Sequence, residues 1–146
     1  NFPGHFLLRV PGADHLLDPC GGRRLYPNDC RELLQRQYGA HIKLSAEHLA
    51  SAEPLQMFQR LSRNLRQLHL SYDDHLGALI NAERVLEIGN GSAADYLARA
   101  SLYQRLECPN AERFDLEHAL LLSDDPIQRL RLTERLGHLP PNTIVH

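Results

Sequence analysis

Cysteine is scarce in this chain, and its few positions argue against a fold built on disulfides. Cys20, Cys30 and Cys108 are an odd number of thiols, far apart in a sequence of 146 residues. They form no CxxC motif, and neither they nor the histidines have the spacing of a zinc site. We therefore expect no structural metal, no cofactor and a reduced, cytoplasmic setting.

Long apolar runs and an excess of one charge are also missing. No run approaches the roughly 18 apolar residues of a membrane-spanning helix, and the first residues lack the pattern of a signal peptide. The formal net charge is −2, which gives no electrostatic footprint for nucleic acid or for an anionic membrane. Hydrophobic residues (42%) and charged residues (23%) occur at ordinary globular levels. We expect neither nucleic acid nor a membrane as a partner.

Two short apolar runs near the start predict a β-hairpin. They cover residues 5–10 and 15–19, and the turn residues Pro-Gly-Ala-Asp lie between them. Side chains alternate between the two faces of a strand, so the loop length decides which residues share a face. A four-residue loop pairs Leu8 with Leu17.

The same register brings two residues of possible catalytic importance together. His5 and Asp18 then lie on one face as diagonal neighbours, close enough for a carboxylate to orient an imidazole. A loop one residue shorter or longer would separate them. Asp18 also suits a turn. Cys20 shares this face and is a candidate nucleophile, although cysteine is more often a small apolar packing residue. Cys30 and Cys108 fall in predicted helices, where we expect them to pack.

Beyond the hairpin the apolar residues recur at helical spacing. Asn28 or Asp29 is expected to cap a short helix that runs through Tyr38 to Gly39, and a one-to-two-turn helix follows at 46–52. Steps of three and four residues then predict five longer helices. These cover about 54–72, 76–86 with a stop at Gly89, 96–106 after a Ser92 cap, 109–120 opened by Pro109, and 127–136 started by Asp125.

An offset of 34 residues superimposes part of this helical region on itself. Leu68 falls on Leu102, Ile80 on Phe114, Ala82 on Leu116, Glu83 on Glu117, Val85 on Ala119 and Leu86 on Leu120. This is the period of tetratricopeptide (TPR) helix pairs, which stack because no pair buries its apolar face alone. We expect two pairs and a fifth, terminal helix.

Polar residues on these helices have two interpretations. Asn64, Arg66 and Glu83 are candidates to line a concave groove that holds a peptide. Solvated helix faces with i, i+4 pairs are the more common arrangement. The arginines from Arg60 to Arg66 recur at helical spacing, and we interpret them as a solvated face.

Several segments together resemble one bacterial family. Asn1-Phe-Pro-Gly-His-Phe-Leu-Leu-Arg-Val followed by Asp18-Pro-Cys-Gly-Gly-Arg resembles the SirB family, transglutaminase-like/TPR proteins named after an invasion regulator. Asn64-Leu-Arg-Gln-Leu, Leu106-Glu-Cys-Pro-Asn-Ala and Asp115-Leu-Glu resemble its helical repeats. The likeness covers nearly the whole chain.

The resemblance implies a core in which a helix carries a Cys and two strands carry a His and an Asp. His5 matches the family's His and Asp18 its Asp, whereas the family's Cys lies upstream of the His. We therefore expect upstream sequence to supply the nucleophile, and no activity from this chain alone. The chain departs from the family at Cys20, where an aromatic is usual, at Glu107, where Gly is usual, and at Glu112, where a small residue is usual.

These observations lead to one expected architecture. The chain should be mostly α, with an N-terminal β-hairpin from a transglutaminase/papain-like α+β core, followed by TPR-like antiparallel helix pairs. The core part should span residues 1–53, the repeats 54–139 and a loose tail 140–146.

Two functions from different classes follow. The first is an interaction or regulatory role, with a protein or peptide partner on the helices; the oligomeric state stays open. The alternative, in a complete protein, is a thiol-dependent acyl transferase or peptidase that uses His5 and Asp18. A third possibility is a degenerate core that only folds the domain.

Overall fold

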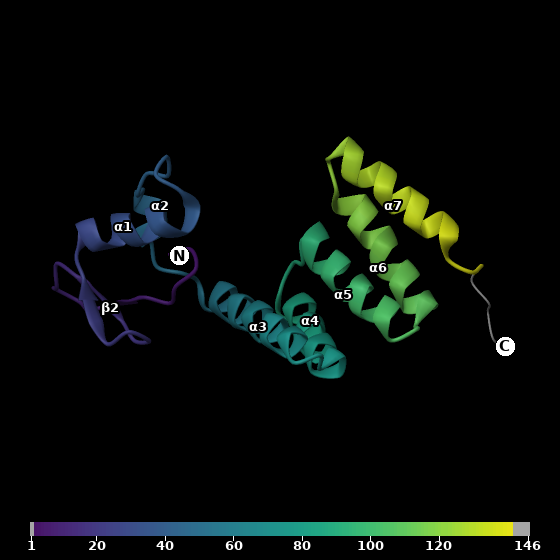
Figure 1. Cartoon of the computed structure of the whole chain (residues 1–146), viewed down its shortest axis with the longest axis horizontal. Coiled ribbons are helices and arrows are strands. Elements are labelled where there is room, and N and C mark those ends of the chain that lie inside the picture. Colours follow the sequence, from purple (N-terminus) through teal and green to yellow (C-terminus); the bar gives the residue numbers. More distant parts are fainter. Residues whose placement is uncertain (1, 142–146) are drawn as a thin grey trace. The chain divides into compact units, whose positions relative to one another are not determined.

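The computed structural model describes residues 2–141, over which three short strands precede seven helices (Figure 1). The chain forms two compact units, Asn1–Glu53 and Pro54–His146. The predicted fold class, a small antiparallel sheet followed by TPR-like helices, is confirmed. Most of the predicted tail at 140–146 lies outside the described residues.

The N-terminal unit holds an antiparallel sheet in the order β1-β2-β3. Strand β1 is Leu8–Arg9 and β2 is Leu16–Asp18, both shorter than the predicted runs. Leu8 pairs with Leu17 and Arg9 with Leu16, so the predicted register is confirmed. The turn closes with a hydrogen bond of 3.1 Å from the Ala13 N–H to the Val10 carbonyl.

Strand β3, Arg23–Leu25, was not predicted, because the sequence indicated only the two strands of the hairpin. Gly22 has a φ of 62°, a left-handed conformation that glycine adopts without strain, and it lets the chain reverse between β2 and β3. Leu25 is the one apolar residue of β3, so the strand has no visible alternation. It is buried against the helices of this unit.

Two helices complete the N-terminal unit: α1, Pro27–Tyr38, and α2, Ala46–Leu49. Tyr26 precedes α1 as its N-cap, so the predicted caps are wrong. Asp29 instead accepts a hydrogen bond of 2.8 Å from the Tyr26 N–H. Helix α2 is also shorter than predicted. The core of the unit consists of Phe2, Leu25, Cys30 and Leu34.

The described part of the second unit, residues 54–141, contains helices and no strand, and all five predicted helices are confirmed. They are α3, Pro54–Ser71; α4, His75–Ile88; α5, Ala93–Arg105; α6, Pro109–Leu122; and α7, Pro126–His138. Helix α3 pairs with α4 and α5 with α6, while α7 packs on α6 (Figure 1). The predicted Ser92 cap and the predicted start of the last helix at Asp125 are confirmed, because each side chain accepts a hydrogen bond from the first turn.

The 34-residue period is visible in the structure. Asp73 and Glu107, 34 positions apart, turn the chain within the two pairs, and both have a φ of 55°. The buried residues of α4 map by the same offset onto those of α6. They are Ala78, Asn81, Ala82 and Val85 in α4, and Glu112, Asp115, Leu116 and Ala119 in α6.

Arginine–carboxylate pairs join the helices of this unit. Arg63 of α3 donates two hydrogen bonds of 2.8 Å to Asp95 of α5. The predicted solvated arginine face is therefore wrong at Arg63. Arg135 of α7 donates at 2.8 Å to the buried Glu112 of α6. This pairing explains how a carboxylate is accommodated where the resembling family has a small residue.

Candidate functional site

Asp18 closes β2 and organises the turn that follows. Its Oδ1 accepts hydrogen bonds of 3.0 Å from the backbone N–H groups of Cys20 and Gly21. The Gly21 bond is the strongest influence lowering the pKa of Asp18; it outweighs burial, and the charges of His5 and Arg23 lower the pKa further. Asp18 therefore stabilises the turn after β2, which is one of the two roles considered from the sequence, and it does so as a carboxylate.

His5 lies just before β1 and is half-buried. Its ring meets the edge of Phe2 with centroids 6.3 Å apart. The charge of His5 is one of the smaller influences that lower the pKa of Asp18. In thiol-dependent catalysis a carboxylate orients the imidazole that takes the proton of the thiol.

The three cysteines have different environments. Cys20 is exposed in the β2–β3 turn, with its backbone N–H bound to Asp18. Cys30 is buried in the core as predicted, and burial raises the pKa of its thiol, which opposes thiolate formation. The prediction for Cys108 is wrong: it is exposed, precedes α6 as its N-cap, and its Sγ donates to the Leu106 carbonyl at 3.4 Å.

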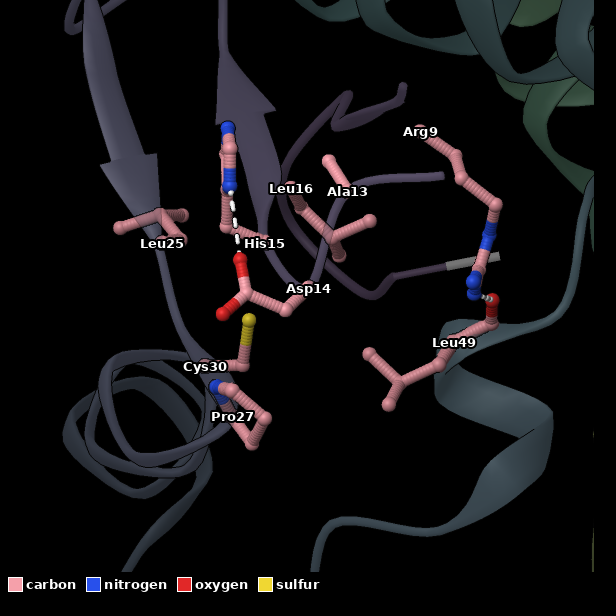
Figure 2. A pocket seen from close by; sticks show the side chains of 9 residues that line it. All are labelled: Arg9, Ala13, Asp14, His15, Leu16, Leu25, Pro27, Cys30 and Leu49. Atoms are coloured by element: carbon pink, nitrogen blue, oxygen red, sulfur yellow. Dashed lines mark hydrogen bonds and ion pairs between the residues drawn. The ribbon is translucent and has the colours of Figure 1, made fainter. Parts of the chain in front are cut away.

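A pocket of about 210 Å³ in the N-terminal unit was not predicted from the sequence (Figure 2). Asp14 lines one wall, and its Oδ1 lies 3.1 Å from His15 Nδ1. Arg9 lines the opposite wall and donates to the Leu49 carbonyl at 2.7 Å, and Figure 2 shows the Cys30 sulfur pointing toward Asp14. Ligand pockets usually exceed about 300 Å³. The space here suits a group the size of one side chain.

The three candidates for a groove differ in exposure. Asn64 is exposed. Arg66 is largely buried, 4.0 Å from Asp95, and Glu83 accepts a hydrogen bond of 3.2 Å from the Tyr103 hydroxyl. The contacts of Arg66 and Glu83 thus join helices within the unit.

Large apolar side chains remain exposed on the helical unit. Their exposed fractions run from 45% to 80%. Where such residues form a contiguous patch, the patch marks an interaction site. These residues, here called the exposed apolar set, are Leu55, Met57, Phe58, Leu61, Leu68, Tyr72, Leu76, Ile80, Phe114, Leu121, Leu122, Ile127 and Leu130.

In residues 2–141, no three His, Cys, Asp or Glu side chains come together as a metal site. Within the same range, none of the helices is both long and apolar enough to span a membrane.

Comparison with known proteins matches two successive parts of the chain to different families. Residues 1–63 match the transglutaminase-like superfamily, and residues 65–137 match the tetratricopeptide repeat. A UPF0162 protein of Pseudomonas aeruginosa is 62% identical over 143 residues, which cover 98% of this chain and 53% of the relative.

A UPF0162 protein of Xylella fastidiosa is 30% identical over 128 residues, which cover 84% of this chain and 46% of the relative. The chain thus spans about half the length of these curated relatives. No solved structure matches it significantly.

Proposed function

Because the chain belongs to the tetratricopeptide repeat family over residues 65–137, we propose that its helical unit binds a protein partner. Stacked helix pairs form extended surfaces that bind other proteins. The observation that carries the proposal is the exposed apolar set, which stays accessible although the helices are packed and joined by ion pairs. A regulatory role through this partner, and membership of the SirB family, are finer parts of the same proposal.

The test divides the chain at its two compact units. Residues 54–141 and residues 1–53 are immobilised separately and exposed to extract from the cells that make the protein. Circular dichroism first checks that each piece is folded. The helical piece should retain the partner that the whole chain retains, and the N-terminal piece should not. Loss of every partner by a folded helical piece would contradict the proposal.

A second candidate function rests on His5 and Asp18. The interaction of the two groups, and the match of residues 1–63 to the transglutaminase-like superfamily, support a thiol-dependent acyl transferase or peptidase in a complete protein. In this candidate Asp18 orients His5, and His5 takes the proton of a cysteine thiol. The nucleophile would come from the part of the longer relatives that this chain does not span.

Thiol alkylation of the complete protein tests this second candidate. An activated thiolate should react with iodoacetamide near neutral pH faster than free cysteine does. His5→Ala should slow the reaction to the rate of free cysteine. Alkylation of the wild-type protein at the free-cysteine rate would contradict the candidate.

A further inference from the structure

Three leucines occupy one position of the 34-residue period: Leu68 in α3, Leu102 in α5 and Leu136 in α7. Their environments differ. Leu102 is 2% exposed and Leu136 is half-buried, whereas Leu68 is 52% exposed. The same side chain at the same repeat position therefore has different neighbours in each helix.

The difference follows from the helix that precedes each leucine. Leu102 packs with Ala78 and Ala82 of α4, the helix before α5. Leu136 packs on the cluster that contains Leu116 of α6, the helix before α7. Helix α3 is the first of the described helical unit, so no helix of that unit precedes it to cover Leu68.

Leu68 belongs to a continuous apolar stripe. Leu61 lies two turns before it and Tyr72 one turn after it, with exposed fractions of 45% and 77%. These three residues define the α3 open face. Asn64 and Gln67, exposed beside it, are uncharged, whereas Asp73, directly after Tyr72, is an exposed carboxylate.

We propose that the α3 open face binds one α-helix of a partner protein. The bound helix packs on α3 as α4 packs on α5. The bound helix presents small residues at positions i and i+4, as α4 presents Ala78 and Ala82 to Leu102. Small residues leave room for the leucine to enter between the helices, which is how Leu102 becomes buried. This inference rests on the proposed protein-binding function and names the surface and the class of partner.

The probe is a peptide of residues 75–88, the sequence of α4, made with a fluorophore and with a hydrocarbon staple between positions 80 and 84. Both stapled positions are exposed in α4, so the staple avoids the face that carries Ala78 and Ala82. The staple is needed because an isolated helix of this length is marginal in water. Fluorescence anisotropy with the whole chain should show saturable binding. A peptide with both Ala78→Glu and Ala82→Glu should not bind.

Substitutions in the chain locate the site. Leu68→Glu should raise the Kd at least about tenfold, which corresponds to about 1.4 kcal/mol, and Tyr72→Glu should weaken binding in the same direction. Asn110→Glu is the matched control, because Asn110 is exposed on α6 and belongs neither to the α3 open face nor to the exposed apolar set. It should leave the Kd within about twofold. Circular dichroism establishes that each variant is folded.

Three outcomes would overturn the inference: no saturable binding, the same Kd for wild type and both α3 variants, or self-association that Leu68→Glu abolishes. Sedimentation velocity detects the last outcome, which would make a second copy of the chain the occupant. If the chain captures a cellular partner equally well with and without Leu68→Glu, the docking inference fails while the proposed function stands.

Discussion

Arg99 of α5 and Asp115 of α6 form two hydrogen bonds of 2.8 and 2.7 Å across the second helix pair. The Asp115 side chain is 0% exposed. A buried carboxylate is tolerated only when it is paired, and the two parallel bonds of a guanidinium fix distance and orientation together. This pair therefore specifies how α5 and α6 pack, alongside the apolar contacts.

Replacing Asp115 tests that role. Asp115→Ala leaves the Arg99 guanidinium without its carboxylate, and should lower the free energy of unfolding by about 3 kcal/mol. Urea denaturation followed by circular dichroism measures the change. Glu117→Ala, at an exposed position of the same helix, is the control and should change it by less than about 0.5 kcal/mol. Equal effects of the two substitutions would refute the role given to the pair.

The lowered pKa of Asp95 should make the stability of the fold depend on pH. Burial raises the pKa of Asp95, but hydrogen bonds from Arg63 and Ser92 outweigh burial and lower the pKa from 3.8 to about 2. A carboxyl group whose pKa is lower in the folded state stabilises the fold above the unfolded pKa. That stabilisation is lost as the pH falls from about 3.8 toward 2.

The Asp95→Asn variant isolates this contribution. The difference in unfolding free energy between wild type and variant should narrow by about 2 kcal/mol between pH 5 and pH 2. Urea denaturation at a series of pH values measures it. A difference that stays constant over that range would show that the Arg63 pair does not hold the pKa of Asp95 low.

The left-handed backbone conformation of Glu107 should make a glycine substitution there stabilising. Its φ of 55° is left-handed, which costs a residue with a Cβ about 1–2 kcal/mol. Glycine avoids this cost but adds about 0.4–1 kcal/mol of entropy to the unfolded chain. Glu107→Gly should therefore raise the unfolding free energy by about 0.5–1 kcal/mol. Glu117→Gly, inside α6, should lower the unfolding free energy by about 1 kcal/mol. Thermal unfolding measures both variants. A change of stability in the same direction for both would contradict the strain assigned to Glu107.

Asp18 allows its turn role to be separated from its proposed catalytic role. Asp18→Asn keeps an oxygen that accepts from the Cys20 and Gly21 N–H groups, whereas Asp18→Ala removes it. Asn should therefore preserve the thermal stability that Ala lowers. In the complete protein, however, Asn should slow thiol alkylation because the negative charge beside His5 is lost. Wild-type alkylation by the Asn variant would leave Asp18 with the turn role alone.

Local patterns predicted much of this fold. The five long helices followed from apolar steps of three and four residues, and the hairpin register from a four-residue turn. Strand β3 was missed because Leu25 is its one apolar residue. The pair of Arg63 and Asp95, 32 residues apart, was missed because helical spacing within α3 gives no information about a carboxylate on α5.

The candidate sites were predictable to different degrees. His5 and Asp18 could be proposed together from the sequence because the predicted hairpin carries both. The pocket of Figure 2 was not, since its walls come from side chains between Arg9 and Leu49 on separate elements. The α3 open face was also not predictable, because the sequence places a leucine at the same repeat position in α3 and in α5. Burial in the structure distinguishes them.

Partner capture by two folded four-site variants of the chain shows whether the exposed apolar set binds the partner. One replaces Leu68, Tyr72, Leu121 and Leu130 of the exposed apolar set with Ser. The other replaces the exposed charged residues Glu87, Glu117, Arg131 and Glu134 with Ser. The wild-type chain and the charge variant should capture the same partner from cell extract, and the apolar variant should not. Equal capture by both variants, or no specific capture by the wild type, would contradict binding through the exposed apolar set.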